Sequence, residues 1–142
     1  MPRRVDEQTA YGRSRVGYSF SSAAADEGTG ILFANDQGRG LVNAFRPTDD
    51  GEIEILWQRE LTTSSGNISV SDRQMVYFTD YLEGSDHLVA LDILTGDELL
   101  RIPTPATRAS IGTILLQPNG DVCMASNEPG EPTGFLVRLT VT

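Results

Sequence analysis

Cysteine and histidine are the side chains most able to supply a nucleophile and a base, and this sequence contains one of each. Thiol catalysis needs a thiolate beside a general base. Cys123 stands in the apolar run Val122-Cys-Met-Ala, whereas His87 belongs to a different segment of the chain. The sequence therefore predicts no catalytic residue, and an enzyme is the less favoured interpretation.

Acidic residues near His87 form the densest set of candidate metal ligands. Asp80, Glu83 and Asp86 lie close together in the sequence, but their spacing departs from the D-x-D-x-D pattern of calcium loops. A polar, glycine-containing turn explains the same residues. Zinc sites need a second histidine or cysteine at short spacing, which His87 lacks. We expect no metal site here.

The chain is acidic, with a formal net charge of −9 over 142 residues. Such a surface repels phosphate backbones, so we expect no nucleic-acid partner. No apolar run approaches the ~20 residues that span a membrane. The polar segment Val5-Asp-Glu-Gln-Thr9 stands where a signal peptide would be apolar. We expect a soluble protein; its compartment stays unknown, and the periplasm and the extracellular space are both compatible.

Three stretches of the chain resemble one another at a period of about 46 residues. Asp36, Asp80 and Asn127 close three apolar runs, 44 and 47 residues apart. The next runs align at Ala44, Ala90 and Arg138. A period of this length, built from short strands, favours a radial or stacked repeat architecture. Each repeat can be divided into up to four short strands, so the expected fold class is an all-β propeller whose blades are four antiparallel strands.

The repeat divides the chain into an N-terminal arm or edge strand (1–15) and a propeller segment (16–142), with repeats near 17–61, 62–105 and 106–142. Middle strands such as Leu88-Val-Ala-Leu are apolar on both faces, which is typical of a sheet packed between two others. The predicted strands are Gly17–Ala23, Gly30–Asn35, Gly40–Arg46, Glu52–Leu61, Asn67–Ser71, Gln74–Tyr81, His87–Ile93, Glu98–Pro103, Ser110–Gln117, Asp121–Ser126 and Gly134–Val141. Between them, Leu82–Asp86 is expected to be a loop.

The run from Leu88 to Arg101 resembles the blade signature of the PQQ-like (quinoprotein-type) β-propellers. Its strand ends in Ala90-x-Asp92, followed by Thr95-Gly96. The glycine suits a turn, and the Asp and Thr side chains can bond turn amides. Four residues after the glycine the family has a tryptophan that packs between blades. Leu100 takes that place in the second repeat, and Trp57 takes it in the first.

About three blades are too few to close a propeller, which typically needs ~4–8. We expect an incomplete propeller, either a fragment of a longer protein or one part of an assembled ring. A protein partner or self-association would complete it. In a dimer of three-blade units, the segment Thr9–Val16 could supply the outer strand that the third repeat lacks.

The resemblance implies a binding surface where two sets of loops meet around the channel. The candidate binding residues on it are Asp36, Arg39, Asn67, Asp80, Tyr81, Arg108 and Asn127.

Two functions follow as hypotheses. The first is a non-enzymatic binding or scaffold module that presents its loop face and blade edges to a protein partner, with no cofactor. The alternative is a portion of a PQQ-dependent dehydrogenase-like enzyme, which would bind PQQ and calcium.

Overall fold

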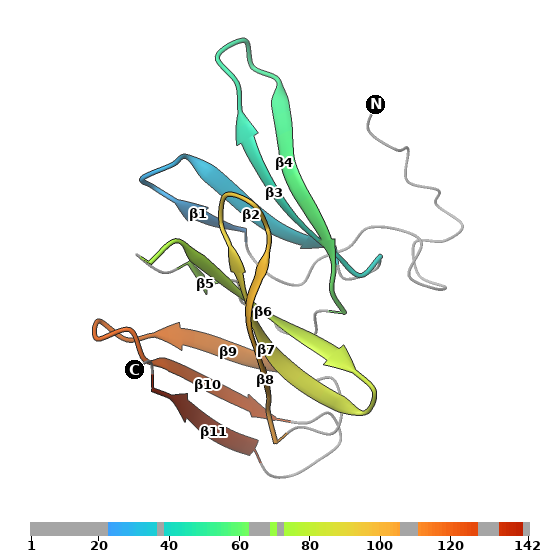
Figure 1. Ribbon diagram of the computed structural model, residues 1–142, viewed down its shortest axis with the longest axis vertical. Helices are drawn as coiled ribbons and strands as arrows, with labels where there is room; N and C mark the ends of the chain where they lie inside the picture. Colours follow the sequence, from blue (N-terminus) through green and yellow to red (C-terminus); the bar gives the residue numbers. More distant parts are fainter. Residues whose placement is uncertain are drawn as a thin grey trace.

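The computed structural model describes residues 23–36, 39–62, 69–70, 73–105, 111–127 and 134–140. Its regular structure is all β, as predicted: three antiparallel sheets, stacked one on another (Figure 1). The strands are β1 (Ala24–Asp26), β2 (Ile31–Asp36), β3 (Leu41–Pro47), β4 (Ile53–Glu60), β5 (Ser69–Val70), β6 (Met75–Leu82), β7 (Ser85–Asp92), β8 (Glu98–Pro103), β9 (Ile111–Leu116), β10 (Val122–Asn127) and β11 (Gly134–Leu139).

Each sheet is a meander in which consecutive strands are neighbours. The first sheet has the order β1-β2-β3-β4, the second β5-β6-β7-β8, and the third β9-β10-β11. The leading strands meet across the stack, since β1 contacts β5 and β5 contacts β9 (Figure 1). Blades that adjoin through their innermost strands in an open stack form an incomplete, propeller-like arrangement.

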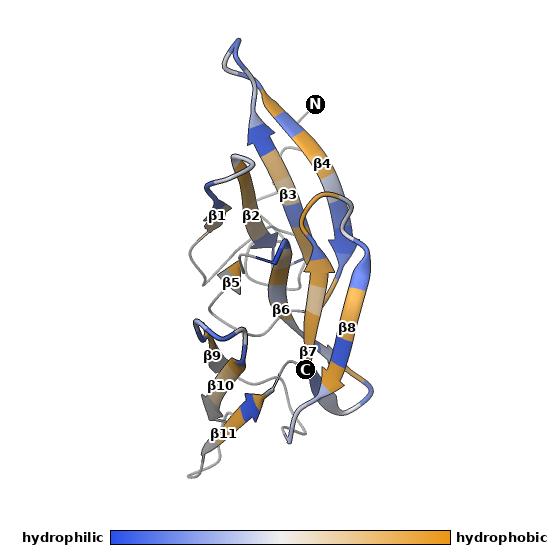
Figure 2. Ribbon diagram, turned by 60° about the vertical axis from the view of Figure 1, so that its left-hand side comes forward, coloured by the Kyte–Doolittle hydropathy of each residue, from blue (hydrophilic) through white to orange (hydrophobic). Residues whose placement is uncertain are grey.

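Two apolar layers hold the stack together. Between the first and second sheets, Phe33 and Val42 pack with Phe78, Val89 and Leu91. The opposite face of the second sheet packs against the third sheet, through the cluster Tyr77, Leu88, Ala90, Ile114 and Val122. Successive residues of β7 therefore point into different layers, which explains the continuous apolar run there (Figure 2).

The first two sheets share a β-bulge at the same place. The register between the third and fourth strands shifts at Ala44/Phe45 in one sheet and at Ala90/Leu91 in the other. Trp57 consequently pairs with Ala44 as Leu100 pairs with Ala90. Trp57 and Leu100 thus occupy equivalent positions, as the sequence predicted.

Trp57 is buried and docks on the second sheet. Its indole Nε1–H donates to the carbonyl of Ile93 at 2.9 Å, and its ring lies against Gly96. The turn that receives it is ordered by side chains: Asp92 Oδ1 accepts from the amides of Leu94 (2.8 Å) and Thr95 (3.0 Å), and Thr95 Oγ1 accepts from Asp97 (3.2 Å). The predicted side-chain bonds to turn amides are therefore present.

In the third sheet, β10 is offset by one residue from the sequence alignment, whereas Arg138 of β11 aligns with Ala90 as predicted. Val122 pairs with Leu116 and Leu139, as Val76 pairs with Val70 and Leu91. Val122 is therefore equivalent to Val76, and Ser126 rather than Asn127 is equivalent to Asp80. The predicted alignment of β10 is therefore wrong by one residue. Because the faces of a strand alternate at every residue, this slip exchanges the buried and the outward positions.

Two predicted elements differ from the structure. The predicted loop Leu82–Asp86 is a two-residue turn, because Leu82 pairs directly with Ser85. Both turn residues have positive φ, 52° at Glu83 and 78° at Gly84, which matches the twist of a tight hairpin. The strand Ala24–Asp26 is not among the predicted strands, and Ala23, the last residue of the predicted strand Gly17–Ala23, lies just before it; the rest of that prediction, like the arm 1–15, lies outside the described residues.

Candidate functional site

The predicted binding residues at strand ends fall on one side of the stack. β2, β6 and β10 all run toward the same side, the right in Figure 1. Asp36 ends β2, Asp80 and Tyr81 lie near the end of β6, and Asn127 ends β10. Asn67 and Arg108 lie outside the described residues. The side-chain position of Asn127 is not described either.

Asp36 and Arg39 form a local unit in the turn between β2 and β3. The amide of Arg39 donates to Asp36 Oδ1 at 3.0 Å, and its Nε lies 3.8 Å from Asp36 Oδ2. These contacts shape the turn itself, and both side chains stay partly exposed to solvent.

Asp80 connects two sheets. The residue is 6% exposed, and its Oδ1 accepts from the amide of Thr62 at 2.7 Å, just beyond β4. Its Oδ2 accepts from Arg101 on β8 at 2.8 Å. The Tyr81 amide donates to the carbonyl of Thr62 at 2.9 Å, so β6 holds the chain leaving the first sheet. Asp80 therefore has a structural role.

Arg101 is held on both sides. Besides Asp80, Glu98 accepts from Arg101 through both carboxylate oxygens, at 2.8 and 2.9 Å. Hydrogen bonding from Arg101 lowers the pKa of Glu98. Sequence inspection missed this cluster because Asp80 and Arg101 are 21 residues apart and only the pairing of β6, β7 and β8 brings them together.

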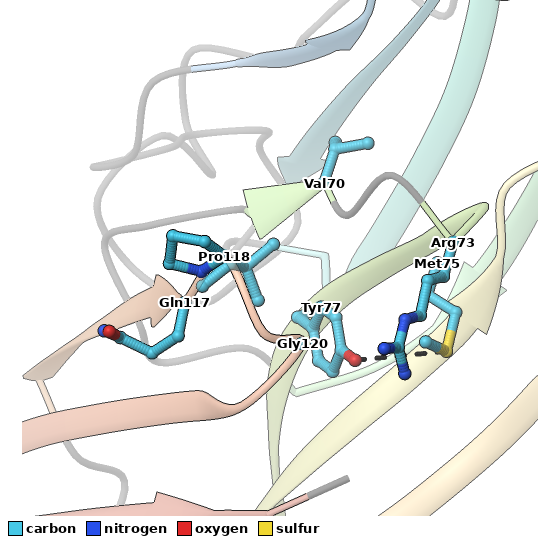
Figure 3. Close-up of a pocket in the computed structure, with 8 residues that line it drawn as sticks. Val70, Arg73, Met75, Tyr77, Gln117, Pro118 and Gly120 are labelled. Carbon is cyan, nitrogen blue, oxygen red and sulfur yellow. Dashed lines mark hydrogen bonds between the residues drawn. The ribbon is translucent and has the colours of Figure 1, made fainter.

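A hollow of about 240 Å³ opens between the second and third sheets, at the ends opposite the predicted loop face (Figure 3). Tyr77 lines it, and the Tyr77 hydroxyl donates to the sulfur of Met75 at 3.9 Å (Figure 3). Arg73 closes one side, with its guanidinium against Gly120. Burial raises the pKa of Tyr77. The apolar lining comes from Val70, Met75, Leu116 and Pro118.

A second hollow, of about 410 Å³, lies where β4 meets the turn between β7 and β8. Arg59 crosses it, donating from Nε to the carbonyl of Gly96 at 2.6 Å and from Nη2 to Asp97 at 3.0 Å. These bonds join the first sheet to the second, so this hollow belongs to the packing between sheets.

Exposed apolar side chains gather on the outer face of the first sheet. Leu32 pairs with Phe45, and Phe45 pairs with Ile55, so all three face away from the second sheet. Ile55 is 64% exposed and Ile53 is 65% exposed. We call Leu32, Asn43, Phe45, Ile53 and Ile55 the first-sheet outer face.

The third sheet presents a comparable outer face. Cys123 pairs with Leu115 and with Arg138, and Ala125 pairs with Leu136. Leu115 is 52% exposed and Leu136 is 75% exposed. We call Leu115, Cys123, Ala125, Leu136 and Arg138 the third-sheet outer face. Sequence inspection missed both surfaces because it does not reveal which face of the first or third sheet packs on the second sheet.

Cys123 and His87 do not form a catalytic pair. Cys123 lies on the third-sheet outer face, whereas His87 lies on β7 of the second sheet, with Nδ1 3.1 Å from the carbonyl of Ser85. Among the described residues, no three His, Cys, Asp or Glu side chains are arranged to hold a metal ion. The same part of the chain contains no helix with the length and apolarity to cross a membrane.

Comparison with protein-family models finds no match, and neither does comparison with curated proteins.

Proposed function

We propose that this protein is a non-enzymatic β-propeller module of the PQQ-like type, which binds a protein partner through its terminal blades. The observation that carries the proposal is the pair of apolar outer faces at the two ends of the stack. Ile53, Ile55, Leu115 and Leu136 are all more than half exposed. Contiguous exposed apolar side chains on a sheet are typical of surfaces that a partner covers.

Three features support the blade type. Gly96 receives the indole of Trp57 from the neighbouring sheet. Asp92 and Thr95 bond the amides of the same turn. The two bulges at Ala44/Phe45 and Ala90/Leu91 repeat the outer half of the blade. The first two features agree with the roles that the resemblance assigns to the turn motif and to the packing tryptophan, and the third shows that two sheets share one blade geometry.

The loop face contributes less to this proposal than the outer faces. Asp80 is buried and bonded to Thr62 and Arg101, so it has little capacity left for a ligand. The Asp36–Arg39 pair is accessible at the rim of that loop face. We therefore assign partner binding mainly to the sheet faces and edges.

The test is capture of partners by the immobilised protein from an extract of its source cells, with variants of each face. Ile55→Lys and Leu136→Glu put a charge into the first-sheet and third-sheet outer faces. Leu94→Lys is the matched control, because Leu94 is 51% exposed in the turn between β7 and β8, away from both faces. We expect the control to retain proteins that the face variants lose. Equal capture by all four proteins would contradict the proposal.

A further inference from the structure

We propose that the partner is a second copy of this chain, bound head to tail, with the third-sheet outer face of one copy on the first-sheet outer face of the other. The inference rests on the proposed function and names its partner. It follows from the repeat, because the chain already contains two contacts of this kind, one between the first and second sheets and one between the second and third.

The second sheet shows what each side of a blade is built to contact. Val76, Val89 and Leu91 pack toward the first sheet. Tyr77, Leu88 and Ala90 pack toward the third. One blade therefore has two unlike faces, one for the preceding blade and one for the following blade.

The first-sheet outer face is equivalent to the side that packs on a preceding blade. Leu32 pairs with Phe45 beside the bulge, as Val76 pairs with Leu91 beside the equivalent bulge. Asn43 precedes Ala44 as Val89 precedes Ala90, so it shares this face. The first sheet thus exposes one half of an inter-blade interface.

The third-sheet outer face is equivalent to the side that packs on a following blade. Because Val122 corresponds to Val76, Cys123 corresponds to Tyr77. Its partner Arg138 corresponds to Ala90, the partner of Tyr77. The two open ends of the stack are therefore opposite halves of one interface, and a second copy supplies to each the half that it lacks.

Each outer face also has one polar side chain on its third strand. Arg138 stands at the Ala90 position of the third-sheet outer face, with its side chain 63% exposed and paired to Asp121. Asn43 stands at the Val89 position of the first-sheet outer face, where Gln58 Nε2 donates to its Oδ1 at 2.6 Å. Where the second sheet has the apolar residues Ala90 and Val89, the outer faces thus have polar ones: a guanidinium on the third sheet and an amide on the first.

Head-to-tail contacts between unlike faces either close into rings or continue into filaments. Two copies with three sheets each give six sheets, which is within the ~4–8 blades of closed propellers. A closed dimer covers both outer faces of both copies. We therefore expect a dimer rather than a larger assembly.

The first measurement is the solution mass by light scattering or sedimentation. The expected result for the wild-type chain is twice its 15.4 kDa mass. Ile55→Lys and Leu136→Glu should each weaken dimerisation by about 100-fold or more, because a charge is buried in the contact. An equimolar mixture of the two should dimerise again, because the intact third-sheet face of one variant meets the intact first-sheet face of the other. Leu94→Lys should remain a dimer.

Cys123 provides a second measurement, because it is the only cysteine and lies on the third-sheet outer face. Ile55→Lys changes the other end of the stack. In a head-to-tail dimer this variant should nevertheless accelerate thiol labelling of Cys123 by about tenfold or more, since dissociation uncovers the thiol. Far-ultraviolet circular dichroism and the unfolding midpoint show whether each variant is folded.

A wild-type monomer at ~100 μM would overturn the second-copy proposal. A wild-type dimer would also overturn it if Ile55→Lys dissociated the dimer while the Leu136→Glu variant remained a dimer and the labelling rate of Cys123 did not change. That result would indicate pairing of like faces. A monomer that still captures a different protein through these faces would leave the proposed function intact. A monomer whose face variants capture the same proteins as the wild type would overturn both.

Discussion

The indole ring of Trp57 lies so close to Gly96 that a Cβ atom added to that glycine would stand 2.6 Å from Cδ2 of the ring. Gly96 has φ +74°, a conformation that glycine adopts without strain. The Nε1–H of Trp57 satisfies the carbonyl of Ile93 in the same stretch. One side chain of the first sheet thus fixes the position of a turn in the second.

Trp57→Phe should lower the free energy of unfolding by about 1–2 kcal/mol, because the Ile93 carbonyl loses its buried donor while part of the ring packing remains. Trp57→Ala should cost about 3–5 kcal/mol, because it also empties the contact with Gly96 and Phe33. Urea unfolding measures both. A Trp57→Phe variant as stable as the wild type would contradict a role for the indole N–H, and equal losses for the two variants would contradict a role for the ring packing.

Gly96→Ala and Gly51→Ala should differ although both glycines have positive φ, +74° and +85°. A Cβ at Gly51 meets nothing within 4 Å, so this variant should lose only the ~1–2 kcal/mol of backbone strain. Gly96→Ala should lose more, because Trp57 must also move. In a Trp57→Ala background the two glycine substitutions should cost the same. An additive double-mutant cycle would show that Trp57 and Gly96 are not coupled.

Asp80→Ala should destabilise the fold by about 1–3 kcal/mol, because it removes the acceptor of the Thr62 amide and one partner of Arg101 in a largely buried site. Asp80→Asn retains an acceptor oxygen for Thr62 and should cost less. Denaturant unfolding of both variants at neutral pH tests this order. If the two variants were equally unstable, the bond to Thr62 would contribute nothing.

Glu98 should make stability depend on pH in the acid range. Hydrogen bonding from Arg101 lowers its pKa in the folded chain below the ordinary value of 4.5. Its contribution is therefore fully present above that value and is lost as the pH falls through the lowered pKa. The stability difference between wild type and Glu98→Gln should shrink as the pH is lowered from 7 to about 3, and unfolding curves across that range measure it. A constant difference would contradict the prediction.

Much of the fold follows from local patterns in the sequence. The strand Glu98–Pro103 agrees with its prediction at both ends. The apolar faces of Leu88-Val-Ala-Leu lie in two layers as predicted. Trp57 packs on the neighbouring sheet, as expected for the tryptophan of the blade signature. These features were predictable because strand periodicity and turn chemistry act over a few residues.

The candidate site was less predictable, because its contacts join distant segments. The repeat predicts Asp80 as a binding residue, yet its carboxylate bonds Thr62 and Arg101, 18 and 21 residues away. The run Val122-Cys-Met-Ala alternates too weakly to show which of its residues are buried, so the alignment placed Asn127 one residue out of register.

The sequence alone determined that this protein is a series of short antiparallel strands with a repeating turn, since those preferences are local. Only the tertiary structure decided that Val122 is buried and Cys123 faces outward, and that apolar side chains remain exposed at both ends of the stack. The reason is physical: a strand is equally regular in either register, and packing against the neighbouring sheet selects which face is buried.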